Sequence, residues 1–181
     1  MELYGVLDKF LEELFTYLRK QDRTLKILTL QVIKMILDIF KNQLPKNIQQ
    51  EVLKNISALI KDDDLYLSQL SIDLLITIIN INPKDSKQYE EAINNCITLS
   101  KSSLARGPAV DKLTELFTAI TASEIINTSH ILDRLLANTN KASLIPTALC
   151  ITAVLSKIKS VINPYLPIFI NNVIENLLIE K

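Results

Sequence analysis

The chain has 181 residues, enough for one substantial core, and 48% of them are apolar although only 6% are aromatic. Its 20 basic side chains balance its 20 acidic ones, so nothing attracts nucleic acid or an anionic membrane over long range. Only 2 residues are glycine, which disfavours β-sandwiches and doubly wound sheets, whose turns usually need more glycine. The composition therefore favours an all-helical protein with a core of leucine, isoleucine and valine.

Apolar residues recur at helical spacing almost from one end of the chain to the other, with short polar interruptions. This periodicity predicts helices over residues 3–19, 24–42, 45–61, 65–81, 86–101, 108–121, 124–137, 142–160 and 164–180. Pro45, Pro83 and Pro164 stand at predicted helix starts, where the missing N–H group would have no partner inside the helix anyway.

The second helix of each predicted pair carries an apolar stripe with the spacing i, i+3, i+7. The stripes begin at Leu30, Ile72, Leu113 and Ile151, so successive starts lie 42, 41 and 38 residues apart. A period of about 40 residues is typical of two-helix HEAT or armadillo repeats, in which each pair buries its apolar faces by stacking on its neighbours. The sequence thus predicts an all-α fold, an α-α superhelix or solenoid of about four and a half helix pairs.

We expect a single solenoid over residues 1–181. The expected repeats cover residues 3–42, 45–81, 86–121 and 124–160, and residues 164–180 supply the first helix of the next repeat. That last helix would leave apolar residues such as Val173 and Leu177 uncovered, whereas the end of a natural solenoid needs a polar face. We therefore expect the chain to be a fragment of a longer protein.

Three consecutive aspartates, residues 62–64, form the turn inside the second predicted pair. A calcium loop that began at Asp62 would need glycine at its sixth position and glutamate at its twelfth, where this sequence has Leu67 and Asp73. Asp63 or Asp64 can instead accept hydrogen bonds from the first N–H groups of the following helix. The aspartates are therefore interpreted as a capping turn and not as a metal site.

Residues that could support catalysis are few. His130 is the only histidine, and no cysteine pair lies near it to complete a zinc site. Cys96 and Cys150 lie on apolar helical patterns, which predicts buried, inert thiols. An enzyme that uses Cys96 or Cys150 as its nucleophile, with His130 as base, is the alternative from a different functional class. The main interpretation has no catalytic residue, no metal ligand and no cofactor.

No segment has the composition of a membrane span or of a secretory signal. The longest apolar runs, residues 74–79 and 144–155, are shorter than the ~20 residues that cross a bilayer. The N-terminal stretch MELYGVLDKF has no basic region ahead of an apolar one, so no signal peptide is expected.

A polar strip accompanies the apolar stripes, at the positions one, five and eight after the first residue of each stripe. Its members are Gln31, Met35, Asp38, Asp73, Thr77, Asn80, Thr114, Thr118, Thr121, Thr152, Ser156 and Lys159. The second helices of a HEAT stack usually line its concave side, so the strip predicts a broad, weakly charged groove that cradles a protein partner. The alternative is a helix face that only contacts water.

Four segments resemble, in order and spacing, successive repeats of the cullin-associated NEDD8-dissociated protein family. They read LRKQDRTLKILTL (18–30), LYLSQLSIDLLITI (65–78), SLARGPAVDKLTELFTAI (103–120) and PTALCITAVLSKI (146–158). The most specific parts are Leu18-Arg19-Lys20 with Arg23 and Leu25-Lys26, and Ser68-Gln69 with the apolar run behind them. These are framework residues of particular repeats, so the resemblance carries no individual contact residue over to this chain.

The resemblance implies a piece from the middle to late repeats of a long HEAT solenoid that wraps around an unmodified cullin and its RING subunit. Such a protein covers the cullin lysine that accepts NEDD8, blocks neddylation and promotes exchange of the substrate-receptor modules of cullin–RING ubiquitin ligases, without covalent catalysis. It implies a location in cytoplasm and nucleus and no direct binding of nucleic acid, membrane or a small-molecule substrate.

A different HEAT scaffold is the alternative within the same fold. It would be a nuclear transport receptor, whose inner loops are often acidic, or a phosphatase scaffold subunit. In this sequence residues 62–64 form the only acidic cluster among the predicted turns, and the other turns are basic or neutral.

Overall fold

The computed structural model describes residues 2–83, 86–137 and 141–158, together with residues 167, 168, 170 and 171. Within these residues the chain forms helices and no strand. The α-helices are α1 (Glu2–Leu18), α2 (Arg23–Phe40), α3 (Lys46–Ser57), α4 (Leu65–Ile81), α5 (Ser86–Ser100), α6 (Pro108–Ala122), α7 (Thr128–Leu136) and α8 (Leu144–Leu155). Two short 3-10 helices, η1 (Lys41–Gln43) and η2 (Lys141–Ser143), precede α3 and α8.

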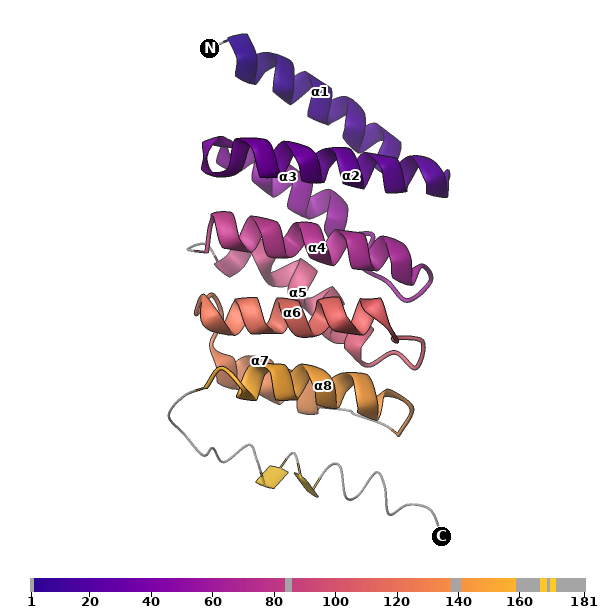
Figure 1. Ribbon diagram of the computed structural model, residues 1–181, viewed down its shortest axis with the longest axis vertical. Helices are drawn as coiled ribbons and strands as arrows, with labels where there is room; N and C mark the ends of the chain where they lie inside the picture. Colours follow the sequence, from indigo (N-terminus) through magenta and orange to yellow (C-terminus); the bar gives the residue numbers. More distant parts are fainter. Residues whose placement is uncertain (1, 84–85, 138–140, 159–166, 169, 172–181) are drawn as a thin grey trace.

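The helices form two layers that run along the length of the molecule (Figure 1). One layer consists of α2, α4, α6 and α8, each of which contacts the next. In the other layer α1 contacts α3, α3 contacts α5 and α5 contacts α7. The pairs α1–α2, α3–α4, α5–α6 and α7–α8 join the layers. This arrangement confirms the predicted all-α solenoid, because each helix packs on its partner and on its neighbours along the stack.

The start of α7 differs from the helix expected over residues 124–137. Glu124 has a φ of 53°, in the left-handed region that ends helices, and the Asn127 Oδ1 atom accepts a hydrogen bond of 2.9 Å from the Ser129 N–H group. Asn127 is therefore the N-cap, and α7 begins at Thr128. The expected helix over residues 164–180, and the residues after 158 of the expected helix over 142–160, lie outside the continuously described ranges.

The four apolar stripes form the core between the layers. Eleven of their twelve residues are at most 2% exposed: Leu30, Ile33, Leu37, Ile72, Leu75, Ile79, Leu113, Leu116, Ile120, Ile151 and Val154. The twelfth, Ile158, is half-buried against the same cluster. Burying one leucine or isoleucine side chain contributes about 1.5–3 kcal/mol relative to leaving it in water. The stripes read from the sequence thus contribute to the core that holds the two layers together, alongside the buried apolar residues of the other helices.

Polar side chains hydrogen-bond to carbonyl groups at the ends of α3, α5 and α7. The Asn95 amide of α5 donates to the Ser57 carbonyl at the end of α3, and the Thr147 hydroxyl of α8 donates to the Ser100 carbonyl at the end of α5, at 2.9 and 3.0 Å. The Lys101 ammonium group donates to the Arg134 and Ala137 carbonyls at the end of α7. Each bond satisfies a carbonyl that has no partner inside its own helix, and so fixes the register between successive repeats.

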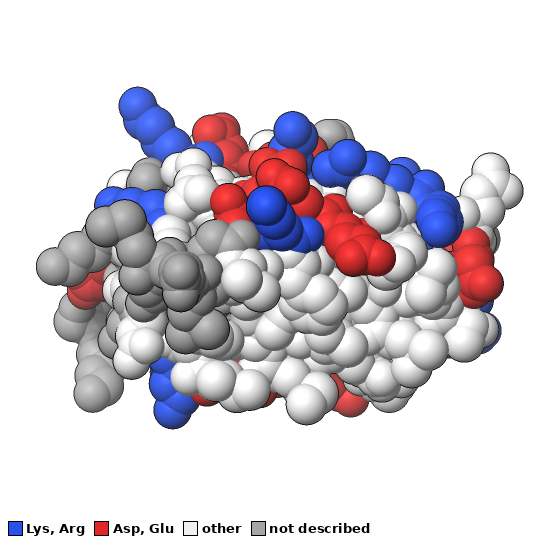
Figure 2. Space-filling view, turned by 90° about the horizontal axis from the view of Figure 1, so that it is seen from above, with Lys and Arg blue, Asp and Glu red and all other residues white. Residues whose placement is uncertain are grey.

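The α1 end of the stack has a charged side and a broad uncharged side (Figure 2). Large apolar side chains of α1 and α2 are exposed to solvent, namely Val6, Phe10, Leu28, Met35 and Ile39. The stack therefore presents an apolar surface on α1 and α2, and α2 also carries the first members of the polar strip.

Candidate protein-binding surface

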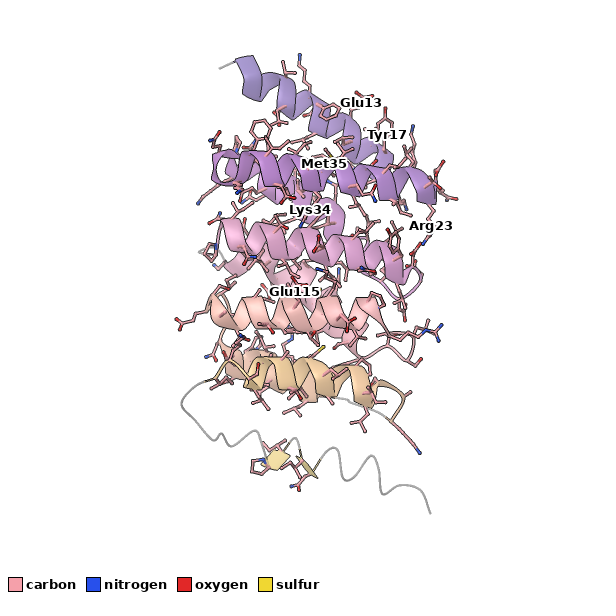
Figure 3. All side chains as sticks on the ribbon, in the orientation of Figure 1. Glu13, Tyr17, Arg23, Lys34, Met35 and Glu115 are labelled. Carbon is pink, nitrogen blue, oxygen red and sulfur yellow. The ribbon has the colours of Figure 1, made fainter. Side chains whose placement is uncertain are left out.

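The structure brings the described members of the polar strip onto a single layer, because α2, α4, α6 and α8 lie side by side. Most of them are exposed or half-buried, and Met35 of α2, labelled in Figure 3, is 62% exposed. Thr121 is buried and donates its hydroxyl to the Phe117 carbonyl at 2.7 Å, so it does not contribute to the surface. Lys159 lies outside the described residues. Whether the strip binds a partner remains a prediction.

A ladder of alternating charges crosses the strip from α2 to α6. The Asp73 carboxylate of α4 pairs with the Lys34 ammonium group of α2 at 2.9 Å and with the Lys112 ammonium group of α6 at 2.8 Å. Lys112 also pairs with Glu115 at 2.7 Å, and Lys34 donates to the Thr77 hydroxyl at 2.7 Å. The ladder joins three helices of the layer, and its first and last members, Lys34 and Glu115, are labelled in Figure 3.

The polar strip read from the sequence contains Asp73 and Thr77 but not the charged residues Lys34, Lys112 and Glu115. A signal was present, because Asp73 lies 39 residues after Lys34 and 39 residues before Lys112. Opposite charges separated by one repeat period face each other across neighbouring helices of a solenoid. A search for charge pairs at that period would have found the ladder.

The ladder holds Asp73 and Lys112 in their charged forms. Burial by itself would raise the pKa of Asp73, but the hydrogen bonds from Lys112 and Lys34 outweigh burial and lower it. Burial would likewise lower the pKa of Lys112, but the bonds to Asp73 and Glu115 raise it. The charges therefore neutralise one another across the neutral pH range, which leaves the middle of the strip polar and only weakly charged.

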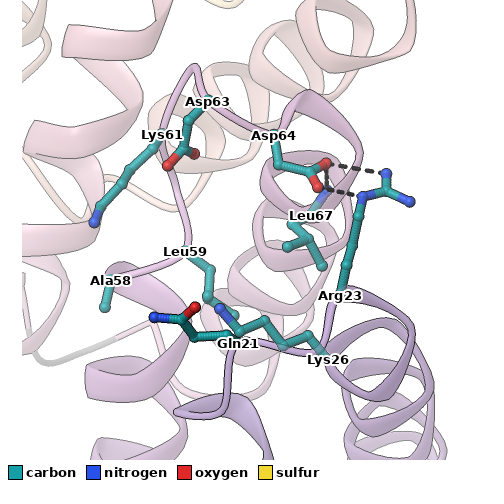
Figure 4. A pocket seen from close by; sticks show the side chains of 9 residues that line it. All are labelled: Gln21, Arg23, Lys26, Ala58, Leu59, Lys61, Asp63, Asp64 and Leu67. Atoms are coloured by element: carbon teal, nitrogen blue, oxygen red, sulfur yellow. Dashed lines mark hydrogen bonds and ion pairs between the residues drawn. The ribbon is translucent and has the colours of Figure 1, made fainter.

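The aspartate turn, residues 62–64, contacts the corresponding turns of the preceding and the following helix pair. Asp64 caps α4, because its Oδ1 atom accepts hydrogen bonds of 3.1 Å from the Tyr66 and Leu67 N–H groups. Its carboxylate also accepts two hydrogen bonds from the Arg23 guanidinium group of the preceding turn, at 2.5 and 3.2 Å (Figure 4). Asp62 accepts a hydrogen bond of 2.8 Å from the Ser102 hydroxyl of the following turn. The capping role predicted for this turn is confirmed, with Asp64 as the cap.

Replacing Asp64 with alanine should lower the free energy of unfolding by about 1–2 kcal/mol near pH 7, mainly through the lost N-cap. The hydrogen bond from Arg23 holds the pKa of Asp64 below its ordinary value of 3.8. A depressed pKa means that the carboxylate stabilises the fold above that value and loses this effect as the pH falls through the folded-state pKa. The difference in urea stability between the native chain and Asp64→Ala should therefore be largest near pH 7 and should shrink as the pH falls below 3.8.

The neighbouring Asp63→Ala variant is the matched control. Asp63 is exposed, and no described residue accepts or donates a hydrogen bond with its side chain. Its replacement should change the free energy of unfolding by less than about 0.5 kcal/mol. Equal losses in the two variants would show that Asp64 is not the cap that stabilises α4.

The candidate catalytic residues differ in their exposure to solvent. His130 is exposed on α7, whereas Cys96 of α5 and Cys150 of α8 are free thiols that are 0% exposed. Burial raises the pKa of Cys150 to about 12, and burial together with the neighbouring Cys150 raises the pKa of Cys96. Neither sulfur is therefore a thiolate at neutral pH.

The part of the chain that the structure describes contains no group of three or more histidine, cysteine, aspartate or glutamate side chains able to hold a metal ion. In the same residues, no helix is both long enough and apolar enough to cross a membrane.

Comparison with known proteins gives a consistent result. No protein-family model matches the chain. The Drosophila melanogaster cullin-associated NEDD8-dissociated protein 1 is 30% identical over 126 residues, which cover 69% of this chain and 10% of that protein. The proteins of the same name from Dictyostelium discoideum and Arabidopsis thaliana are 30% and 28% identical over 125 residues, 66% of this chain. The chain spans about a tenth of the length of these relatives. The chain is therefore related to a segment of the proteins of the cullin-associated NEDD8-dissociated protein family.

Proposed function

We propose that the chain is part of a HEAT-repeat scaffold that binds a cullin and its RING subunit before NEDD8 is attached. The observation that carries the proposal is the similarity to three relatives that are named as cullin-associated and NEDD8-dissociated. The two-layer stack supports it, because a solenoid presents an extended surface that can wrap a large protein partner. The proposed repeat units are residues 3–42, 45–81, 86–121 and 124–160, followed by a helix over 164–180.

In the proposed mechanism the scaffold covers the cullin lysine that accepts NEDD8 and competes with the substrate-receptor adaptor for the cullin. The scaffold and the adaptor then each weaken the binding of the other to the cullin by the same coupling free energy. The scaffold thereby blocks neddylation and promotes exchange of substrate-receptor modules in the cytoplasm and nucleus. It needs no cofactor, since it acts by binding and by competition without making or breaking a covalent bond.

We propose the polar strip as the surface of this chain that contacts the partner. Its exposed members Gln31, Met35 and Asn80 lie on neighbouring helices of a single layer. The ladder through Asp73 fixes the spacing of those helices at mid-length and leaves no unpaired charge there to be desolvated when a partner covers it.

Binding to a purified cullin–RING complex, immobilised with or without NEDD8 attached, tests the proposal. We expect this chain to bind the unmodified complex at least about tenfold more tightly than the neddylated one, a difference of about 1.4 kcal/mol. Absence of binding to both forms, or equal binding to both, would overturn the cullin assignment for this chain and leave the solenoid fold standing.

A pair of matched variants tests the strip itself. Asn80→Arg places a bulky cation on the strip, and Thr98→Arg places the same group on an exposed position of α5 in the other layer. We expect Asn80→Arg to weaken cullin binding at least about tenfold and Thr98→Arg to leave it unchanged. If both variants bind like the native chain, the partner contacts another surface.

A further inference from the structure

Two adjoining hollows lie beside the turns that join α1 to α2 and α3 to α4. The larger, of about 630 Å³, is lined by residues that include Arg19, Lys26, Lys54 and Leu59. The smaller, of about 280 Å³, includes Lys26 and Leu59 again together with Lys61 (Figure 4). Both are lined by Lys26, Ala58 and Leu59, so they adjoin, and together they are called the basic groove. Its cations are Arg19, Arg23, Lys26, Lys54 and Lys61.

The lysines of the basic groove have no anionic partner among the described residues. The other conspicuous charges of this region are engaged: Arg23 pairs with Asp64, and Arg19 lies against Asn55 and Glu51. For the amino groups of Lys26, Lys54 and Lys61, no described residue supplies a hydrogen bond or an ion pair. The carboxylates of Asp63, Asp64 and Glu91 also line the two hollows, but the five cations there outnumber them, so the lining carries a local excess of positive charge in a chain whose formal net charge is zero.

The charge of Lys26 lies at the unfavourable end of the dipole of its own helix. It lies in the first turn of α2, which contains no acidic residue, although the positive end of a helix dipole favours acidic side chains there. Arg23 lies in the same turn but is paired with Asp64, whereas Lys26 extends into the smaller hollow beside Gln21 and Leu59 (Figure 4). A cation kept at an unfavourable end of a helix and directed into a hollow is positioned for a ligand.

We propose that the basic groove binds a short acidic segment of a protein partner. The carboxylates of the segment would pair with Lys26, Lys54 and Lys61, and the apolar surface of Ala58 and Leu59 would take one apolar side chain between them. Such a site is separate from the polar strip and does not depend on the proposed binding of cullin.

The groove fits an acidic peptide better than a nucleic acid. Glu91 lines the larger hollow, and Asp63 lines the smaller one. These carboxylates would repel the evenly spaced phosphates of a nucleic-acid strand, whereas a peptide can place its acidic residues only where the lysines lie.

Fluorescence anisotropy with a labelled peptide tests the proposal. The probe is a peptide of about ten residues in which three glutamates are separated by serines around one central leucine, and a peptide with lysine in place of each glutamate is its counterpart. We expect saturable binding of the acidic peptide alone, weakened at least about tenfold when the ionic strength rises from about 0.05 to about 0.5 M. No binding of the acidic peptide would overturn the proposal.

Two double variants locate the site. Lys26→Gln with Lys54→Gln should weaken binding of the acidic peptide at least about tenfold, whereas Lys9→Gln with Lys46→Gln, which removes the same charge from exposed positions outside the groove, should not. Thermal unfolding of Lys26→Gln should be unchanged or shifted upward, because the lysine opposes the helix dipole. Equal weakening by both double variants, or tighter binding of a single-stranded oligonucleotide than of the acidic peptide, would overturn the assignment.

Discussion

Replacing Phe117 with alanine should lower the free energy of unfolding by about 3–5 kcal/mol. Phe117 lies on α6 and is 0% exposed. Because α6 contacts α4, α5 and α8, the cavity would open where neighbouring repeats and both layers meet. The loss adds the transfer free energy of the ring to the cost of the cavity. Urea unfolding followed by far-UV circular dichroism measures the change.

The same substitution should also affect cooperativity. A solenoid is held together by contacts between neighbours only, so a weak central interface uncouples the helices on its two sides. We therefore expect Phe117→Ala to lower both the urea midpoint and the slope m of the transition, as the two halves begin to unfold separately.

Phe10→Ala is the matched control, because it makes the same chemical change on α1 at a position that is 46% exposed. It should change the free energy of unfolding by less than about 0.5 kcal/mol. A loss below about 1 kcal/mol for Phe117→Ala, or a loss equal to that of Phe10→Ala, would contradict the central place of α6 in the core.

The parts of the fold that follow from local physics were predictable from the sequence. The stripes that start at Leu30, Ile72, Leu113 and Ile151 required only the helical period, and their regular recurrence was enough to predict the stack. The cap at Asp64 followed because an aspartate before a helix satisfies N–H groups only a few residues away.

Features that depend on packing between repeats were not predictable in the same way. The ladder through Asp73 and the basic groove around Lys26 combine residues from successive repeats, and their positions depend on how closely one pair stacks on the next. The helical period specifies which face a residue occupies but not which residue of the neighbouring helix it meets.

Thr121 is buried although the helical period placed it on the exposed polar strip. It lies eight residues after Leu113, which at about 100° per residue places it about 80° from the start of the stripe, nearer to the core than the other strip positions. Asp38 and Asn80 occupy the same register and stay exposed, whereas Thr121 is buried. Its hydroxyl is satisfied by the Phe117 carbonyl of its own helix, so a threonine can be covered at this position at little cost.

Cys96 and Cys150 should react with the thiol reagent dithiobis(nitrobenzoate) at least about a thousandfold more slowly in the native protein than in about 6 M guanidinium chloride. Both sulfurs are 0% exposed, and burial raises the pKa of both, to about 12 for Cys150. The reagent therefore lacks access as well as the thiolate that attacks it. The release of the coloured thiol, followed over time, gives both rates.

The variant Ser103→Cys supplies the control, because Ser103 is exposed in the turn between α5 and α6 and a thiol there should react at the rate of an unfolded chain. Fast reaction of the native protein without this substitution would contradict the buried assignment and favour the alternative of a nucleophilic thiol.

The slow rate of the native protein also reports on how often the core opens. Cys96 and Cys150 lie on α5 and α8, whose contact must open before the reagent enters, so the native rate measures how often that contact breaks. Phe117→Ala should then accelerate labelling, since α6 packs against both helices and its cavity weakens the same contact.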